Sequence, residues 1–278
     1  MPAELEPQDK LIVLNDLRFH YLDWGNDGAP PAVLLHGLSS HAHVWEPLAA
    51  LLRPRYHVLA LDQRGHGDSQ WTPPYTTESY VADLEAFVDA LGLGPMLLIG
   101  HSMGARNAWV YAARHPQRVE RLVIVDIGPE VMPAGVERMR LSTAAPDEFD
   151  RPEDALQMMR LANPRPSDEL LRLRVYNNLR QLPSGRWTWK YDKALRDFQR
   201  AAAAGLPTAE MWGLLAQIRR PTLIIRGAES DILAADVAER MAQAIPQATL
   251  TTIEGAGHTV PADQPAAFEE AIRRFLGL

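Results

Sequence analysis

Residues 96–114, MLLIGHSMGARNAWVYAAR, place a glycine–x–serine–x–glycine motif between a short apolar run and a segment that reads as a helix. The apolar run Met96–Ile99 is typical of a strand that is buried on both faces of a sheet. The motif Gly100–Gly104 predicts a sharp strand-to-helix turn, because glycine lets backbone segments approach where a Cβ atom would clash. Such a turn exposes the hydroxyl of Ser102, which is therefore the candidate nucleophile.

Strand-like and helix-like segments alternate on both sides of this turn. The opening segment 11–22 predicts a β-hairpin, since two apolar or alternating runs flank Asn15-Asp16. The alternation that follows predicts a mostly parallel sheet with helices on both faces, an α/β fold. The remaining predicted strands are 32–35, 58–61, 96–99, 122–125, 223–225 and 248–252, and the predicted helices outside the middle region are 44–52, 77–91, 103–114, 234–245 and 265–275.

The middle region, residues 129–218, shows no convincing strand. It contains amphipathic helical stretches at 152–161, 167–182 and 191–204, punctuated by proline and arginine. A helical insertion after the sixth strand would cover the carboxyl edge of the sheet, where open α/β sheets bind their ligands. We therefore predict a core domain formed by residues 1–128 and 219–278, with residues 129–218 as a helical lid.

The composition excludes several kinds of chemistry. The 278 residues include no cysteine, which rules out disulfides, thiolate metal sites and a cysteine nucleophile. A net charge of −7, from 28 basic and 35 acidic residues, argues against a nucleic-acid partner. No nucleotide-binding glycine motif follows a strand, and His41 and His43 lack companions at a metal-ligand spacing, so we expect no cofactor and no metal.

The amino-terminal stretch, MPAELEPQDK at residues 1–10, does not resemble a signal peptide. It carries acids where a positive segment would stand, and no apolar run follows it. The longest apolar runs of the chain are far shorter than the roughly 20 residues of a membrane-spanning helix. We therefore expect a cytoplasmic protein without a membrane partner.

The candidate nucleophile needs a base and an orienting carboxylate, because a serine hydroxyl is weak at neutral pH. His258 is the candidate base, since it lies in a glycine-rich loop before the last predicted helix. Asp231 is the first candidate for the acid, because it follows the strand 223–225 and gives the chain order Ser102, Asp231, His258. Asp126 also follows a predicted strand and stays an alternative.

A tetrahedral intermediate also needs hydrogen-bond donors for its negative oxygen. The backbone N–H of Met103, at the start of its helix, is one candidate, and that of Leu38, after the third strand, is the other. Three tryptophans of the middle region are candidates for lining an apolar substrate pocket, with packing inside the lid as the alternative. They are Trp187, Trp189 and Trp212.

Taken together, these motifs resemble the α/β-hydrolase family of the single-serine esterase type. The segments that carry the resemblance occur in family order across almost the whole chain, and they are His36–Leu38, Asp62–Ser69, Gly100–Gly104, Gly227–Asp231 and Gly255–His258. The resemblance implies an α/β-hydrolase fold in which Asp62–Ser69 builds the loop behind the nucleophile. Ser102 separates the chain from similar dehalogenases and epoxide hydrolases, which have an aspartate there.

The resemblance and the candidate residues predict a cofactor-free serine hydrolase. Its substrate is expected to be a small to medium, mainly apolar carboxylic ester, a small-molecule partner. A lactonase or a C–C bond hydrolase acting on vinylogous diketones would use the same three residues in a pocket of different polarity. A hydrolase-like small-molecule receptor with slow turnover is a third hypothesis. The natural substrate and the oligomeric state are not determined by the sequence.

Overall fold

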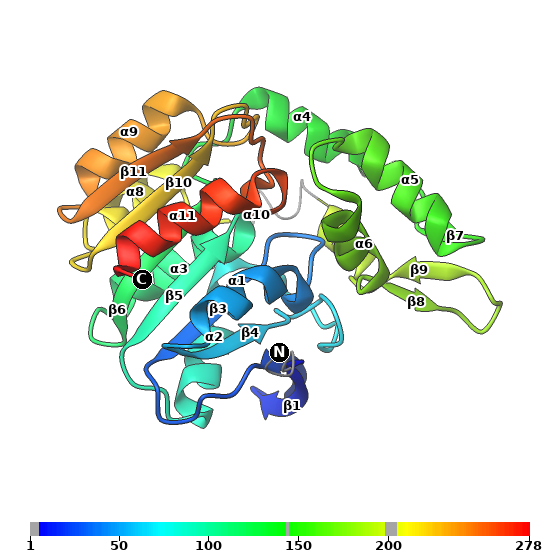
Figure 1. Ribbon diagram of the computed structural model, residues 1–278, viewed down its shortest axis with the longest axis horizontal. Coiled ribbons are helices and arrows are strands. Elements are labelled where there is room, and N and C mark those ends of the chain that lie inside the picture. The colour runs from blue at the N-terminus through cyan, green and yellow to red at the C-terminus, as the bar shows by residue number, and fades with distance from the viewer. Residues whose placement is uncertain (1–5, 143–144, 198–204) are drawn as a thin grey trace.

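The computed structural model describes residues 6–142, 145–197 and 205–278, and a large central sheet organises them (Figure 1). Within these ranges the sheet contains the strands β1 (Gln8–Leu14), β2 (Leu17–Asp23), β3 (Pro31–Leu35), β4 (His57–Leu61), β5 (Met96–His101), β6 (Val119–Val125), β10 (Thr222–Gly227) and β11 (Ala248–Ile253). Their order across the sheet is β1-β2-β4-β3-β5-β6-β10-β11. The β1–β2 and β2–β4 pairs are antiparallel and every other pair is parallel, which confirms the predicted hairpin and the predicted mostly parallel sheet.

Helices cover both faces of this sheet, because alternate side chains of each buried strand point to opposite faces. In β5, Leu98 packs into the cluster on one face, whereas Leu97 and Ile99 pack into the cluster on the other. The first face is covered by α2 (Thr77–Ala90), α3 (Met103–Arg114), α8 (Thr208–Leu215) and α9 (Ala235–Ala244). The second face is covered by η1 (Ala42–Trp45), α1 (Glu46–Leu52) and α11 (Pro265–Leu276), the last preceded by the short α10 (Val260–Asp263).

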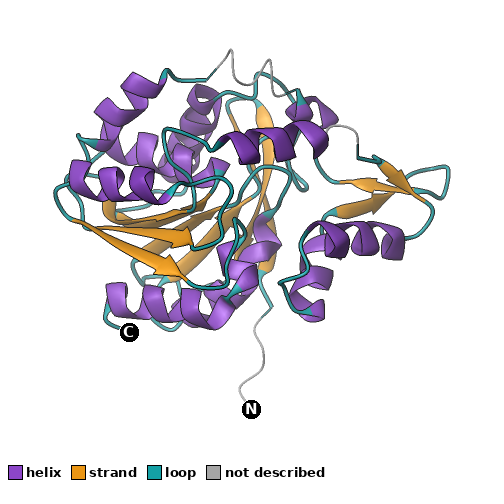
Figure 2. Cartoon of the chain, turned by 90° about the horizontal axis from the view of Figure 1, so that it is seen from above, coloured by secondary structure: helices purple, strands orange, loops and turns teal. Residues whose placement is uncertain are grey.

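The chain between β6 and β10 leaves the sheet and forms a smaller body beside it (Figures 1 and 2). Its elements are α4 (Pro133–Ser142), β7 (Glu148–Phe149), α5 (Pro152–Ala162), α6 (Asp168–Tyr176), β8 (Leu179–Gln181), β9 (Trp187–Trp189) and η2 (Lys193–Arg196). Within the described part of this region, the three strands form a separate antiparallel sheet in the order β7-β9-β8. A hydrophobic cluster of its own, which includes Phe149, Leu171 and Trp189, holds these elements together.

This smaller body differs from the all-helical insertion expected from the sequence. The expectation of no strand is wrong, because strands of two or three residues are too short to show a periodicity of their own. The predicted helix 167–182 ends at Tyr176, after which β8 begins. In the predicted helix 191–204, the chain forms a 3₁₀ turn at Lys193–Arg196, and residues 198–204 lie outside the described ranges.

The carboxyl-terminal end of the expected lid also differs from the prediction. Helix α8 lies within residues 129–218, yet its Met211, Leu214 and Leu215 belong to the hydrophobic cluster of the main sheet. It contacts α3 and α9, two helices of the core. The part of the middle region that stands apart from the core therefore ends before α8. None of the described helices is long and apolar enough to cross a membrane.

Candidate active site

Ser102 occupies the sharp turn between β5 and α3. Its φ of 52° and ψ of −120° lie outside the regions that non-glycine residues favour, so the turn is strained. A Cβ atom on Gly100 would lie 2.4 Å from the carbonyl oxygen of Gly104, and one on Gly104 would lie 2.3 Å from the carbonyl oxygen of Leu35. The strand-to-helix reversal thus requires glycine on both sides of Ser102.

The close backbone contact at Gly104 carries a prediction about stability. We expect Gly104→Ala to lower the free energy of unfolding by about 3 kcal/mol, because the new Cβ atom would overlap the β3 backbone. The matched control is Gly213→Ala in α8, where a Cβ atom would meet nothing within 4 Å. That variant should gain about 0.5–1 kcal/mol from helix propensity. Urea unfolding of both variants measures the difference, and equal stability of the two would contradict the argument.

His258 connects Ser102 to a buried carboxylate. Its Nε2 lies 2.9 Å from Oγ of Ser102, and its Nδ1 lies 2.8 Å from Oδ2 of Asp126. Asp126 directly follows β6, is fully buried, and also accepts hydrogen bonds from the N–H of Gly227 and the hydroxyl of Ser230. Because a carboxylate accepts the Nδ1 proton, Nε2 is left to take a proton from the serine hydroxyl.

Asp231, the expected acid, forms no hydrogen bond or ion pair with His258 in the described structure; its partner is Arg138. Its two carboxylate oxygens accept hydrogen bonds from Nε and Nη2 of Arg138, at 2.5 and 3.1 Å. Partial burial by itself would raise the pKa of Asp231, but the Arg138 guanidinium holds it below its ordinary value. In the structure, the carboxylate beside the His258 imidazole is therefore that of Asp126, the alternative candidate, and not that of Asp231. The order of residues along the chain did not separate the two, because both follow neighbouring parallel strands.

The two predicted backbone donors lie beside the nucleophile. Met103 begins α3, where the first N–H groups have no partner inside the helix. Leu38 follows Gly37, whose position is so close to the turn that an added Cβ atom would lie 3.2 Å from Cβ of Ser102. Among the described residues, neither N–H donates a hydrogen bond to another group of the protein. Both are therefore free to bind a negative oxygen formed near Ser102.

A polar network missed by the sequence reasoning holds the Leu38 loop in place. The ring of His36 contacts the carbonyl oxygen of Gly37 through Nδ1 and accepts the N–H of Gln63 at Nε2. The Gln63 side chain donates to the carbonyl oxygen of His36 and accepts from the side chain of Asn107 in α3. Burial lowers the pKa of His36 to about 4. The neutral ring thus ties the predicted oxyanion loop to the helix after the nucleophile.

A second set of contacts shapes the loop expected behind the nucleophile, Asp62–Ser69. His20, Asp62 and Asp68 form the group of possible metal ligands found among the described residues. Asp62, however, already accepts hydrogen bonds from the ring of His20 and from the N–H groups of Ala42 and Asp68. Burial alone would raise the pKa of Asp62, but the contact with His20 lowers it well below its usual range. These contacts support a scaffold role for the loop.

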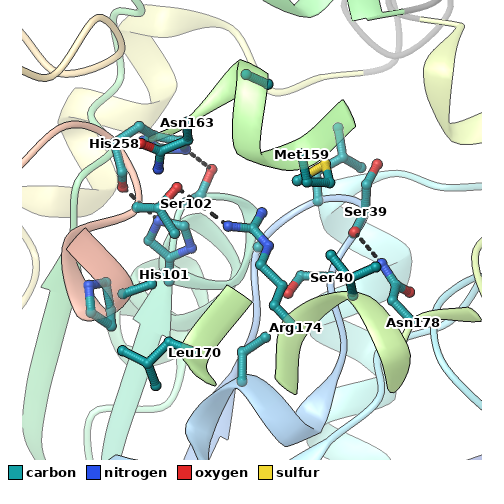
Figure 3. Close-up of a pocket in the computed structure, with 18 of the residues that line it drawn as sticks. Ser39, Ser40, His101, Ser102, Met159, Asn163, Leu170, Arg174, Asn178 and His258 are labelled. Carbon is teal, nitrogen blue, oxygen red and sulfur yellow. Dashed lines mark hydrogen bonds between the residues drawn. The ribbon is translucent and has the colours of Figure 1, made fainter. Parts of the chain in front are cut away.

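A pocket with a volume of about 340 Å³ opens onto Ser102 and His258 (Figure 3). Its wall is mainly apolar and comes from both the core and the smaller body, through residues that include Leu48, Phe268, Met159, Leu170 and Trp189. Of the three candidate tryptophans, only Trp189 lines this pocket. Trp187 packs with its neighbours in the smaller body, and the indole N–H of Trp212 donates to Glu130 under the guanidinium of Arg240. Trp187 and Trp212 therefore do not line the pocket, and for Trp187 the alternative of packing inside the smaller body holds.

The comparisons with known proteins agree with this fold. Residues 30–265 match the family described as the alpha/beta hydrolase fold, and the chain belongs to this family. It is 31% identical to the sn-1-specific diacylglycerol lipase ABHD11 of Mus musculus, over 94% of this chain and 85% of that protein. It is also 31% identical to the esterase Rv0045c of Mycobacterium tuberculosis, over 92% of this chain and 85% of that protein.

A solved structure is similar along the whole chain. It is an alpha/beta hydrolase from Novosphingobium aromaticivorans, 31% identical, with a TM-score of 0.87 and coverage of 99% of both chains. The protein is accordingly a hydrolase with relatives that include an esterase and a lipase.

Proposed function

We propose that the protein is a carboxylic ester hydrolase that acts through an acyl-enzyme on Ser102. The observation that carries the proposal is the hydrogen-bonded series Ser102, His258 and Asp126 at the mouth of an apolar pocket. Two unpaired backbone N–H groups stand beside it, and the similarity to an esterase and a lipase points to the same chemistry.

The proposed mechanism gives each of these groups a defined role. Ser102 Oγ attacks the ester carbonyl while His258 Nε2 takes the hydroxyl proton. The N–H groups of Leu38 and Met103 stabilise the negative oxygen of the tetrahedral intermediate. His258 then returns the proton to the departing alcohol, and water repeats the sequence on the acyl-enzyme. Asp126 holds the imidazole in the required tautomer and stabilises its cation.

The smaller body acts in this proposal as a lid that selects the substrate. Helices α5 and α6 supply Met159 and Leu170 to the pocket wall, opposite side chains of the core such as Leu48. A pocket of about 340 Å³ accommodates a small or medium acyl or alcohol group. Its apolar wall favours hydrocarbon chains over sugars or nucleotides.

An activity and labelling experiment tests the proposal. We expect the purified protein to hydrolyse 4-nitrophenyl butyrate and to react with a fluorophosphonate probe at Ser102. A ring lactone and a ring-fission diketone, assayed beside the ester, test the two competing reactions. Higher kcat/KM for either competitor would replace the ester assignment. Absence of both labelling and hydrolysis would overturn the serine-hydrolase proposal itself.

A further inference from the structure

Arg174 brings a positive charge into the mainly apolar pocket. It lies near the end of α6, and its side chain points from the smaller body toward Ser102 and His258 (Figure 3). Its Nη1 lies 3.4 Å from the hydroxyl oxygen of Thr259, the residue that follows His258. Burial lowers the pKa of His101, next to Ser102, and the nearby charge of Arg174 acts in the same direction. The guanidinium therefore stands close to the reacting groups.

This guanidinium differs from the other arginines of the pocket because it has no counter-ion. Arg138 is paired with Asp231, and Arg196 with Asp147 at 2.8 Å. Within the described ranges, no carboxylate oxygen lies within 4.0 Å of a nitrogen of Arg174. Outside those ranges, the only acidic residue of the chain is Glu4.

The surroundings of Arg174 explain why an anion would be favourable here. Burial lowers the pKa of Arg174, and the like charge of Arg138 adds to the effect, although Asp263 opposes it. Asp263 itself is occupied, since it accepts hydrogen bonds from the side chain of Asn163 and the N–H of Gly257. Burying a guanidinium without a carboxylate partner costs free energy, which a bound anion would offset.

We propose that Arg174 binds a carboxylate of the substrate, so that the preferred ester carries a free carboxylate besides its ester group. This inference rests on the proposed ester hydrolysis and names its substrate class. The planar guanidinium matches a carboxylate through two parallel hydrogen bonds. The apolar wall around Met159 and Leu170 would contact the hydrocarbon chain between the carboxylate and the scissile bond.

Two pairs of esters that differ only in charge test the proposal. One pair is 4-nitrophenyl hydrogen adipate and its neutral methyl ester, with the carboxylate on the acyl side. The other is 4-carboxyphenyl butyrate and its methyl ester, with the carboxylate on the alcohol side. For each pair the measured quantity is the ratio of kcat/KM for the charged ester to kcat/KM for the neutral one.

The variants are Arg174→Met and the matched control Arg172→Met. Arg172 lies on the same helix, is exposed, and stacks on Tyr176 outside the pocket. We expect Arg174→Met to lower the ratio by about 10- to 100-fold in one of the two pairs, the loss typical of a hydrogen bond to a charged group. The pair affected identifies the side of the ester that carries the carboxylate. Arg172→Met should leave the ratio unchanged, and Arg174→Lys should lower the ratio less than Arg174→Met does.

A binding measurement separates this inference from the proposed reaction. Monomethyl adipate is titrated calorimetrically into the Ser102→Ala protein, with and without Arg174→Met. We expect the Ser102→Ala protein to bind monomethyl adipate, and we expect the added Arg174→Met substitution to raise the Kd at least tenfold. Equal ratios and equal binding with and without Arg174 would overturn the inference, whereas lack of hydrolysis of all four esters would overturn only the proposed reaction.

Discussion

Ser102→Ala is expected to lower kcat for 4-nitrophenyl butyrate by roughly five orders of magnitude, the scale seen when a serine nucleophile is removed. The hydroxyl oxygen at 2.9 Å from His258 Nε2 is the atom that would form the acyl-enzyme. Alanine leaves no atom there to attack the carbonyl. The residual rate would come from the amides of Leu38 and Met103 and from substrate binding alone.

The control for this variant is Ser184→Ala, a serine in the exposed turn between β8 and β9. It should keep both full activity and fluorophosphonate labelling, whereas Ser102→Ala should lose both. Thermal unfolding of the two proteins shows whether the fold is preserved. A loss of less than about tenfold for Ser102→Ala would assign the nucleophile to another residue.

Asp126→Asn is expected to lower kcat by about 10⁴-fold, because an amide at this position favours the wrong tautomer of the histidine. Asp126 Oδ2 lies 2.8 Å from His258 Nδ1 and accepts its proton. An asparagine NH₂ in the same place would donate to Nδ1 and move the ring proton to Nε2. The imidazole could then no longer accept the proton of Ser102.

Asp231→Asn is the matched variant, since it makes the same chemical change in the loop that follows the neighbouring strand, β10. Because Asp231 is paired with Arg138 and not with His258, its loss of activity should stay below about tenfold, unlike that of a triad acid. Asp126 also accepts hydrogen bonds from Gly227 and Ser230, so unfolding curves must accompany both assays. A larger loss for Asp231→Asn than for Asp126→Asn would restore the original assignment from the sequence.

The features that sequence reasoning predicted well are local in character. Backbone contacts at the Ser102 turn leave no room for a side chain at Gly100 or Gly104. The sequence motif therefore predicts the turn directly. The alternating buried side chains of β5 likewise follow from a short apolar run between two helices. His258 was identified because its glycine-rich loop follows the last strand, β11, and the structure brings its ring to Ser102.

The features that sequence reasoning missed depend on contacts between distant segments. Trp187, Trp189 and Trp212 look alike in the sequence, yet of the three only Trp189 lines the pocket. Trp212 is excluded because α8 packs in the core, whereas Trp187 lies two residues before Trp189 on β9 and packs within the smaller body. The sequence also does not show that Arg174 lacks a carboxylate partner. The fold decides which carboxylates lie near each arginine of the middle region.

The sequence by itself determined the α/β fold, the strained serine turn and the histidine loop, because each follows from apolar spacing and glycine placement over a few residues. The tertiary structure alone decided the acid. Strands β6 and β10 are neighbours, so Asp126 and Asp231 both leave the same edge of the sheet. Asp126 is buried and hydrogen-bonded to His258, whereas Asp231 is paired with Arg138, from a helix nearly a hundred residues earlier in the chain.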